Sequence, residues 1–357
     1  MGFSKEKSKF AEETEKESIM IQPEKTSKYA VVVSLLTLCF IACNGKASEI
    51  SNHSSNPIVT IERFDKGLPS YVQETDSAQI FLFIDKYTPF FPVYCRHILG
   101  LGDAPSFQKG LKMFLSNEAI SQLYADTETK FSNDTVWITE LQNAFLRYNE
   151  LFAPQKRPRI LTHISGLNQS IVTIDTTLLS VSLDCYLGEN YPLYEQRYYN
   201  YERNLHESNR IPIDVVEVWL RTLYPYQSQR NALLDRMIYE GKILYCLSQI
   251  FPRTNEYVLL GYSDKQAQWC KENEAEIWKQ LIGKKHLFNT ESMLINKYIE
   301  PAPFVSVLHQ DAPGRLGRWI GLQIIKAYAN EKKKEAIEII ETTDNGGEIL
   351  SASKYNG

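Results

Sequence analysis

The sequence lacks the local spacings from which most metal and redox centres are built. No two of its six histidines lie within ten residues of each other, and no two of its six cysteines form a C-x-x-C pair. Structural zinc sites usually take two ligands from one short segment, and thiol redox sites use the C-x-x-C spacing. These absences argue against both kinds of centre, and we expect no metal and no cofactor.

The sequence also lacks an excess of charge of one sign. It carries 39 basic and 43 acidic side chains, for a formal net charge of −4. Its longest basic run, Lys332–Lys334, is bounded by Glu331 and Glu335, which is typical of a solvated helix end. A nucleic-acid-binding protein needs a basic face to neutralise phosphates. We therefore expect no nucleic acid among the partners.

No hydrophobic run is long enough to span a bilayer, which takes about 20 residues in a helix. The longest run, YAVVVSLLTLCFIA at 29–42, has fourteen residues and follows Lys25 and Lys28. That length after basic residues is typical of the apolar core of an export signal. We expect residues 1–42 to be a cleaved signal peptide. Because residues 1–19 make an unusually long and charged beginning, we expect translation to start at Met20.

The signal ends in Phe40-Ile41-Ala42-Cys43, which resembles the lipobox of bacterial lipoprotein signals. The resemblance implies a mature protein that begins at a lipid-carrying Cys43 and is anchored to a membrane of the cell envelope, facing the periplasm. A simple secretory signal with a chance cysteine is the alternative. Residues 43–57 are polar and rich in Ser and Asn, as in a flexible tether between lipid and domain.

The rest of the chain predicts one globular α+β domain over 58–345, mainly helical around a small sheet, with a flexible tail at 346–357. Segments in which β-branched and polar residues alternate predict strands near 58–64, 159–166 and 169–188. The last two segments, in the middle of the chain, form either a hairpin or two neighbouring strands. Apolar residues at helical spacing, bounded by caps and prolines, predict helices near 117–130, 133–152, 213–224, 231–251, 264–281 and 315–330.

One helical stretch, RMIYEGKILY at 236–245, has a glutamate where a zinc peptidase carries H-E-x-x-H. In that motif two histidines at i and i+4 bind zinc while the glutamate acts as the general base. Here the two ligand positions hold Tyr239 and Ile243. On a helical wheel both lie on a second apolar face, opposite the main core stripe. We therefore expect a helix buried on both faces, with no metal and no catalytic residue.

Glu240 has two interpretations. It could form a surface ion pair with Arg236 one turn earlier. Alternatively, it holds a buried network or a ligand, which requires a partner such as Arg315 or Arg318 because an unpaired buried carboxylate is costly. Asp184, at the end of a predicted strand, either caps that element or forms an ion pair, or it lines a cleft.

Gly317, Trp319 and Gly321 recur at two-residue spacing in a predicted helix. Glycines on a helix allow another backbone to approach closely. We expect a tight helix contact there, with Trp319 filling the adjacent gap.

An ordered set of short motifs resembles the gliding-motility lipoprotein GldB family of Bacteroidetes. The motifs are Arg63-Phe64-Asp65, Phe90-Phe91-Pro92, Leu183–Gly188, Met237–Lys242, Ala312–Arg315 and Gly317–Gly321. The resemblance implies a lipid-anchored envelope protein that is required for gliding and acts non-catalytically through contacts with the gliding and secretion machinery and other envelope proteins. Because that family is similar to zinc-dependent peptidases, it also implies a zincin-like fold with a degenerate metal site, in which Glu274 occupies the place of a third ligand. A hydrolase with a remodelled site that uses Glu240 is the alternative.

Overall fold

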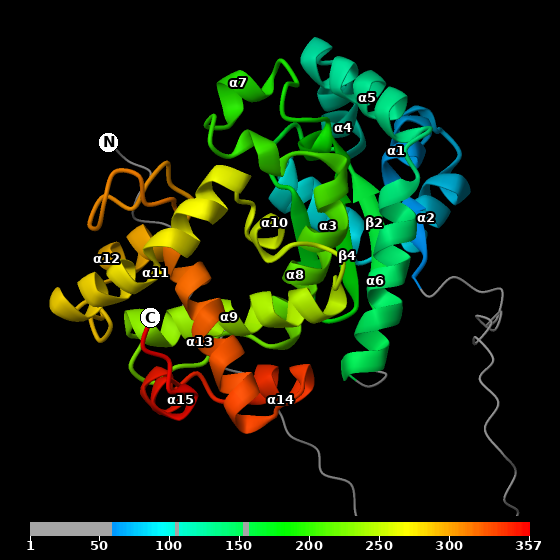
Figure 1. Cartoon of the computed structure of the whole chain (residues 1–357). Helices are drawn as coiled ribbons and strands as arrows, with labels where there is room; N and C mark the ends of the chain where they lie inside the picture. The colour runs from blue at the N-terminus through cyan, green and yellow to red at the C-terminus, as the bar shows by residue number, and fades with distance from the viewer. Residues whose placement is uncertain (1–58, 104–106, 153–156) are drawn as a thin grey trace, which may run out of the picture. The chain divides into compact units, whose positions relative to one another are not determined.

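A small mixed sheet surrounded by helices forms the described part of the chain (Figure 1). The computed structural model describes residues 59–103, 107–152 and 157–357. The expected signal 1–42, Cys43 and the tether 43–57 lie outside these ranges. Within them the mainly helical α+β class that the sequence predicts is confirmed.

The sheet has four strands in the order β1-β2-β4-β3. Their bounds are β1 Ile61–Arg63, β2 Arg159–His163, β3 Ile171–Ile174 and β4 Leu178–Ser182. The β1–β2 and β2–β4 pairs are parallel, and only β3–β4 is antiparallel. The hairpin therefore lies within the predicted segment 169–188, where Asp175 takes the left-handed conformation that a tight turn favours. The two central segments are neighbours, but through a parallel β2–β4 pairing.

Alternating residues of the central strands face two different cores. Ile160 and Leu179, which lie opposite each other in the register, belong to the larger core. Leu161 and Leu178 belong to the smaller one. Successive side chains of a strand point to opposite faces of a sheet, so each face is covered by its own set of helices.

The smaller core is an aromatic cluster centred on Phe64. Its ring packs edge-on against Tyr87, Phe90 and Tyr94 at centroid distances of 5.0, 5.1 and 5.0 Å. Such edge-to-face pairs add to the stabilisation from buried area. The elements that supply or support this cluster are α1 (Phe64–Gln73), α2 (Ser77–Lys86), α3 (Phe90–Val93), η1 (Tyr94–Ile98) and α4 (Phe107–Leu115).

The larger core lies between the sheet and a stack of long helices. These are α6 (Val136–Phe152), α8 (Ile211–Leu223), α9 (Leu233–Ile250) and α13 (Leu316–Lys332). Helix α8 contacts β3 and β4 as well as α6 and α9, while α13 crosses α9 (Figure 1). Helices α8 and α9 stop before Pro225 and Pro252, as expected from the clash of a proline ring with the preceding turn.

The remaining elements are short connections and outer helices. They are α5 (Glu118–Phe131), η2 (Leu183–Tyr186), α7 (Tyr194–Arg197), η3 (Arg203–Leu205), η4 (Ser208–Arg210), α10 (Glu256–Leu260), α11 (Asp264–Gly283), α12 (Ser292–Ile299), α14 (Ala336–Glu341) and α15 (Gly346–Ser353). The four cysteines of the described ranges are buried free thiols: Cys95, Cys185, Cys246 and Cys270.

The C-terminal segment 346–357 is not the flexible tail that the sequence suggested. Residues Gly346–Ser353 form α15, which packs against α9 and α13. The amide of Gly346 donates to Asp235 at 2.8 Å, and Ile349 is buried. Asn345 caps the helix, so a short stretch that begins with two glycines becomes helical once this cap and the tertiary contacts are in place.

Helices α9 and α13 touch backbone to backbone at two glycines. A Cβ added to Gly241 would lie 2.2 Å from the carbonyl oxygen of Gly321, and one added to Gly321 would lie 1.8 Å from that of Met237. Gly317 lies close to α12 as well, where an added Cβ would be 2.9 Å from the side chain of Ile299 and 3.1 Å from the carbonyl oxygen of Tyr298. The close contact predicted around these glycines is confirmed.

We predict that Gly321→Ala destabilises the protein by about 3 kcal/mol, because its methyl group must push two helix backbones apart. Urea unfolding of the purified protein measures the change. Gly283→Ala is the matched control: it also lies in a helix, but no atom lies within 4 Å of its added Cβ. That control should be neutral or stabilising by up to about 1 kcal/mol. Equal effects of the two substitutions would contradict the close contact.

Candidate functional site: a buried arginine–glutamate network

The helix that carries the degenerate motif is buried on both faces. In α9, 14 of 18 residues are buried. Ile243 is fully buried, and the hydroxyl of Tyr239 donates to the carbonyl oxygen of Tyr224 at 3.1 Å. The first of the two ligand positions is therefore occupied by a hydrogen-bonded phenol and the second by a core aliphatic.

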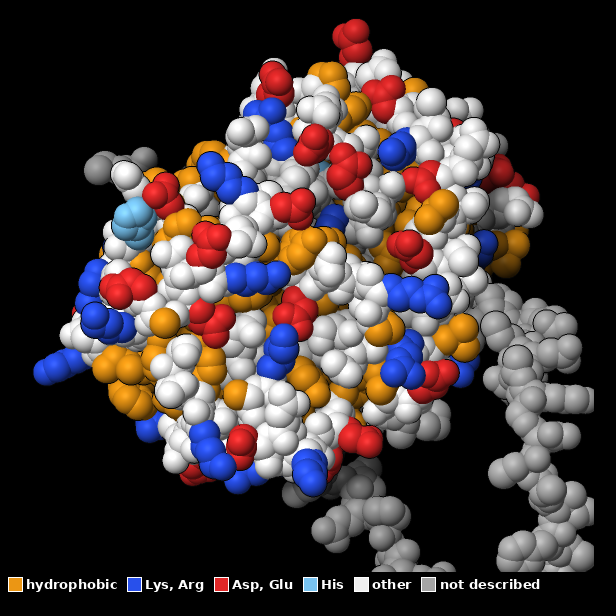
Figure 2. Space-filling model, viewed as in Figure 1, with side chains coloured by type: hydrophobic (Ala, Val, Ile, Leu, Met, Phe, Trp, Pro, Cys, Tyr) orange, Lys and Arg blue, Asp and Glu red, His pale blue; other side chains and the backbone are white. Residues whose placement is uncertain are grey.

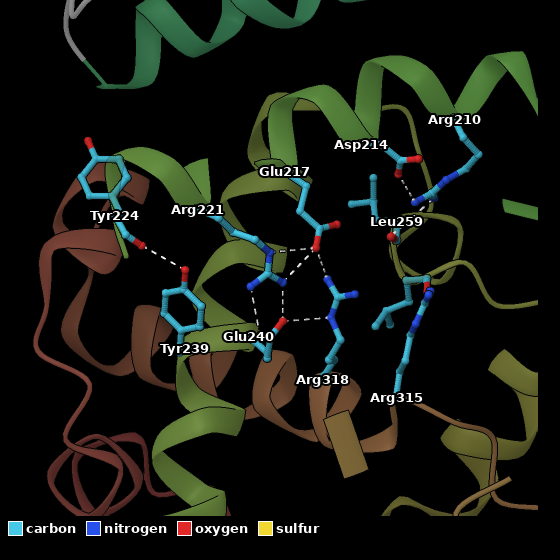
Figure 3. Close-up of polar contacts among 11 residues, drawn as sticks. Arg210, Asp214, Glu217, Arg221, Tyr224, Tyr239, Glu240, Leu259, Arg315 and Arg318 are labelled. Atoms are coloured by element: carbon cyan, nitrogen blue, oxygen red, sulfur yellow. Dashed lines mark hydrogen bonds and ion pairs between the residues drawn. The ribbon is translucent and has the colours of Figure 1, made fainter. Parts of the chain in front are cut away.

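Glu240 is also buried, and arginines contact both of its carboxylate oxygens (Figure 3). Arg221 of α8 donates to Oε1 at 3.0 Å and to Oε2 at 2.5 Å, which is a bidentate pair. Arg318 of α13 places its Nε 3.1 Å from Oε2. Glu240 thus joins helices α8, α9 and α13.

The surface ion pair between Glu240 and Arg236 does not form. The guanidinium of Arg236 lies over the ring of Tyr226, 4.0 Å from its centroid. Residues i and i+4 are neighbours on a helix, but a buried carboxylate gains more from partners that share its desolvated environment.

Glu217 is the second carboxylate of this network. Its Oε1 accepts from Nε and Nη2 of Arg221 at 3.1 and 2.8 Å, and from Nη2 of Arg318 at 2.7 Å. Two arginines and two glutamates therefore neutralise one another across the three helices (Figure 3). Removing any one of the four charges would leave a buried charge without its full set of partners.

The electrostatics of the network favour the charged form of every member whose pKa is shifted. Burial opposes ionisation of Glu217, but Arg318 and Arg221 outweigh it and hold the pKa of this carboxyl well below its usual value. Burial also opposes the charge on Arg221, yet Glu217 and Glu240 raise the pKa of its guanidinium above the ordinary value. Glu217 and Arg221 are therefore charged at neutral pH.

Charged residues of α8 and the residue that precedes it, Arg210 of η4, form one stripe. Arg210, Asp214, Glu217 and Arg221 recur at spacings of three and four residues, which places them on one face of a helix. Arg210 pairs with Asp214 at 2.8 Å, and Tyr186 donates to the same carboxylate at 3.1 Å. Sequence reasoning missed this stripe, although charged residues at helical spacing within the otherwise apolar IPIDVVEVWLR were a usable signal.

A cavity of about 370 Å³ opens in front of the network. Its wall includes Glu217 and Arg221 of α8, Arg210 at the end of η4, and Arg315 and Arg318 at the beginning of α13. Glu240 is not part of that wall, because it lies behind Arg221 and Arg318. The cavity is thus faced by guanidinium groups.

The other residues singled out from the sequence lie apart from Glu240. Asp184 is fully buried, where it accepts from the amides of Ser165 and Leu167 at 3.2 and 2.8 Å and so fixes the loop after β2. Glu274 of α11 accepts from the hydroxyl of Tyr355 at 2.8 Å. In the described ranges, neither Asp184 nor Glu274 shares a hydrogen-bond or ion-pair partner with Glu240.

Arg315 lines the cavity without reaching Glu240. Its Nη1 donates to the carbonyl oxygen of Leu260 at 3.0 Å. Of the two partners considered for Glu240, only Arg318 is within ion-pair distance.

The donor set around Glu240 does not fit a zinc ion. In the parts of the chain that the structure describes, no three His, Cys, Asp or Glu side chains are grouped to hold a metal. The neighbours of Glu240 are cationic, and a dication beside two guanidinium groups would be repelled.

Comparison with known proteins gives one family. A model for the gliding motility protein GldB matches residues 44–357. The chain belongs to the GldB family. The family name indicates involvement in gliding motility. No curated protein and no solved structure matches the chain significantly.

We predict that Glu217→Gln lowers the free energy of unfolding by about 3 kcal/mol at neutral pH, because it leaves Arg221 and Arg318 short of one negative charge. Since the pKa of Glu217 is lowered by folding, its contribution is complete above the unfolded value of about 4.3 and is lost as the pH falls below it. The difference in the free energy of unfolding between wild type and Glu217→Gln should therefore decrease in acid. Urea unfolding across a pH series measures this difference.

The exposed Glu150 provides the control for this substitution. It pairs with Arg147 at the surface, with 63% of its side chain exposed. Glu150→Gln should change stability by at most about 0.5 kcal/mol. If Glu217→Gln lowered the free energy of unfolding by the same amount in acid as at neutral pH, the role assigned to the charge of Glu217 would be contradicted.

Proposed function

We propose that this member of the GldB family is a lipid-anchored protein of the cell envelope that supports gliding non-catalytically. It faces the periplasm and acts through contacts with other proteins of the motility machinery. The lipid would hold the domain at the membrane, and the polar segment 43–57 would give it reach.

The state of Glu240 is the observation that carries the non-catalytic assignment. A general base must come within hydrogen-bond reach of the proton that it abstracts. Both oxygens of Glu240 are instead engaged by Arg221, Arg318 adds a second cation, and these side chains separate the carboxylate from the cavity. Tyr239 and Ile243, at the two motif positions, supply no pair of ligands for a metal ion that could activate a water.

The sequence before the domain supports the lipid anchor. Residues 40–43 resemble a lipobox, and the region that matches the family begins at residue 44, directly after Cys43. In the described ranges, no helix has both the length and the apolar character needed to cross a bilayer. Acyl chains on one cysteine hold a protein at a membrane because each buried CH₂ contributes roughly 0.8 kcal/mol.

We predict that Glu240→Gln and Arg221→Gln reduce gliding only as far as each lowers the amount of protein. Both substitutions break the same ion pair, so both should destabilise by about 3 kcal/mol, but only the first removes the carboxylate. Gliding speed of cells and immunoblots of their envelope fractions measure the two quantities together, with Glu150→Gln as control.

A hydrolase that uses Glu240 would give a different result. Glu240→Gln would then abolish gliding at a normal protein level while Arg221→Gln at the same level still glides. Stoichiometric zinc in the purified wild-type protein would point the same way. Either result would contradict the non-catalytic assignment.

The lipid anchor is tested separately at Cys43. Labelling cells with radioactive palmitate should mark the wild-type protein, and Cys43→Ser should lose the label because its thiol is the acylated group. Cys39→Ser, four residues earlier in the signal, is the control and should keep the label. Palmitate that remains on Cys43→Ser would exclude this site of lipidation.

A further inference from the structure

Arg315 is the cavity arginine whose charge the protein does not pair. Arg210, Arg221 and Arg318 each form a salt bridge with a carboxylate. Arg315 donates one hydrogen bond to the carbonyl oxygen of Leu260, and in the described ranges no carboxylate lies within ion-pair distance of it. Figure 3 shows its side chain beside Arg318 but directed away from Glu240. A guanidinium has five N–H donors, so most of those of Arg315 are available to a ligand.

The surroundings of Arg315 increase the cost of its unpaired charge. Burial and the neighbouring Arg318 both lower the pKa of its guanidinium. An arginine nevertheless stays protonated in proteins, so the charge persists and an anion placed beside it would be attracted.

The backbone holds Arg315 in a conformation that is rare for a residue with a side chain. Its φ of 61° and ψ of 18° are left-handed. Two glycines make room for this arrangement: a Cβ on Gly314 would lie 2.2 Å from the carbonyl oxygen of Ala302, and one on Gly261 would lie 3.1 Å from Nη1 of Arg315. Strained residues that are fixed by their neighbours cluster at ligand sites.

The cavity offers hydrogen-bond donors to one kind of ligand. Besides the four arginines, Ser170, Tyr186 and Tyr198 line it, but the hydroxyls of Tyr186 and Tyr198 already donate to Asp214 and to the thiol of Cys185, so the arginines are the main donors. On the face seen in Figure 2 acidic and basic side chains are interspersed, and the cavity is likewise lined by four arginines and three carboxylates, which leaves one arginine in excess. The planar fork of a guanidinium matches the geometry of carboxylate and phosphate oxygens.

Glu202 lines the same cavity and opposes an anion. It forms no ion pair among the described residues, whereas the other lining carboxylates, Asp214 and Glu217, are paired with arginines. Its negative charge should weaken the binding of an anion without occupying Arg315.

We propose that this cavity is an oxyanion-binding site in which Arg315 is the principal partner and Arg318 and Arg210 strengthen the local field. The ligand group is a carboxylate or a phosphate. A volume of about 370 Å³ accommodates such a group with a few attached atoms, so a larger ligand would extend out of the cavity. This binding does not depend on the lipid anchor or on the role of Glu240.

Calorimetric titration of the full-length protein in detergent tests the site. The probes are inorganic phosphate, N-acetyl-alanyl-alanine with a free carboxylate, and the same dipeptide as its amide. Saturable binding of phosphate indicates a phosphate ligand, and binding of the acid but not the amide indicates a peptide carboxylate. No binding of either anion, or equal binding of the acid and the amide, would overturn the proposal.

Two substitutions should change the affinity in opposite directions. Arg315→Gln should weaken binding about tenfold or more, since it removes a charged hydrogen-bond donor. Glu202→Gln should strengthen binding about threefold by removing repulsion. Arg96→Gln, whose arginine pairs with Asp103 at the surface, is the matched control and should bind like the wild type.

A second variant covers the case in which Arg315→Gln does not fold, as judged by its melting curve. Arg315→Lys keeps the charge but loses the planar fork of donors, and it should bind the anion more weakly than the wild type. Affinities that are the same for wild type, Arg315→Lys and Glu202→Gln would refute the site.

Discussion

The contact between Gly241 and Gly321 sets the geometry on which the centre of the protein depends. Without side chains at these positions, the backbones of α9 and α13 approach until added methyl groups would overlap carbonyl oxygens. Glu240 adjoins one glycine, and Arg318 lies one turn before the other. The ion pair between them therefore exists because two helices can touch. Larger residues at the glycines would separate the two charges, so that Glu240 would keep only Arg221 and Arg318 would keep only Glu217.

The network that this contact brings together has a limited role in stability. Desolvation of buried ions offsets much of their attraction, and well-packed apolar residues often serve as well. Apolar residues could not, however, supply the charged groups that the network places in the wall of the cavity. Arg221 and Arg318 satisfy Glu240 on one side and face the cavity on the other. The same two guanidinium groups thus neutralise the buried carboxylate of Glu240 and supply positive charge to the wall of the cavity.

The sequence predicted those features that depend on local periodicity. Burial of Tyr239 and Ile243 followed from the helical wheel, and the approach at Gly321 from the glycine spacing. The partners of Glu240 could not be fixed in this way, because Arg221 is nineteen residues away on another helix and Arg236 was nearer in sequence. The parallel pairing of β2 with β4 and the docking of α15 likewise arise from tertiary contacts that leave no local pattern. The charged stripe of α8 was visible, but spacing alone does not distinguish a solvated face from a buried one.

The charges around Glu240 separate α9 from an H-E-x-x-H helix by more than its two missing histidines. In a zinc peptidase the carboxylate must be free to take a proton from a metal-bound water. Here two guanidinium groups hold it, and a restored pair of histidines would place a dication close to both of them. A change of two residues would therefore not recover a zinc site; Arg221 and Arg318 would also have to go, and Glu217 would then be buried without a partner. The role of Glu240 has to be argued from the ion pairs that surround it rather than from the spacing of a motif.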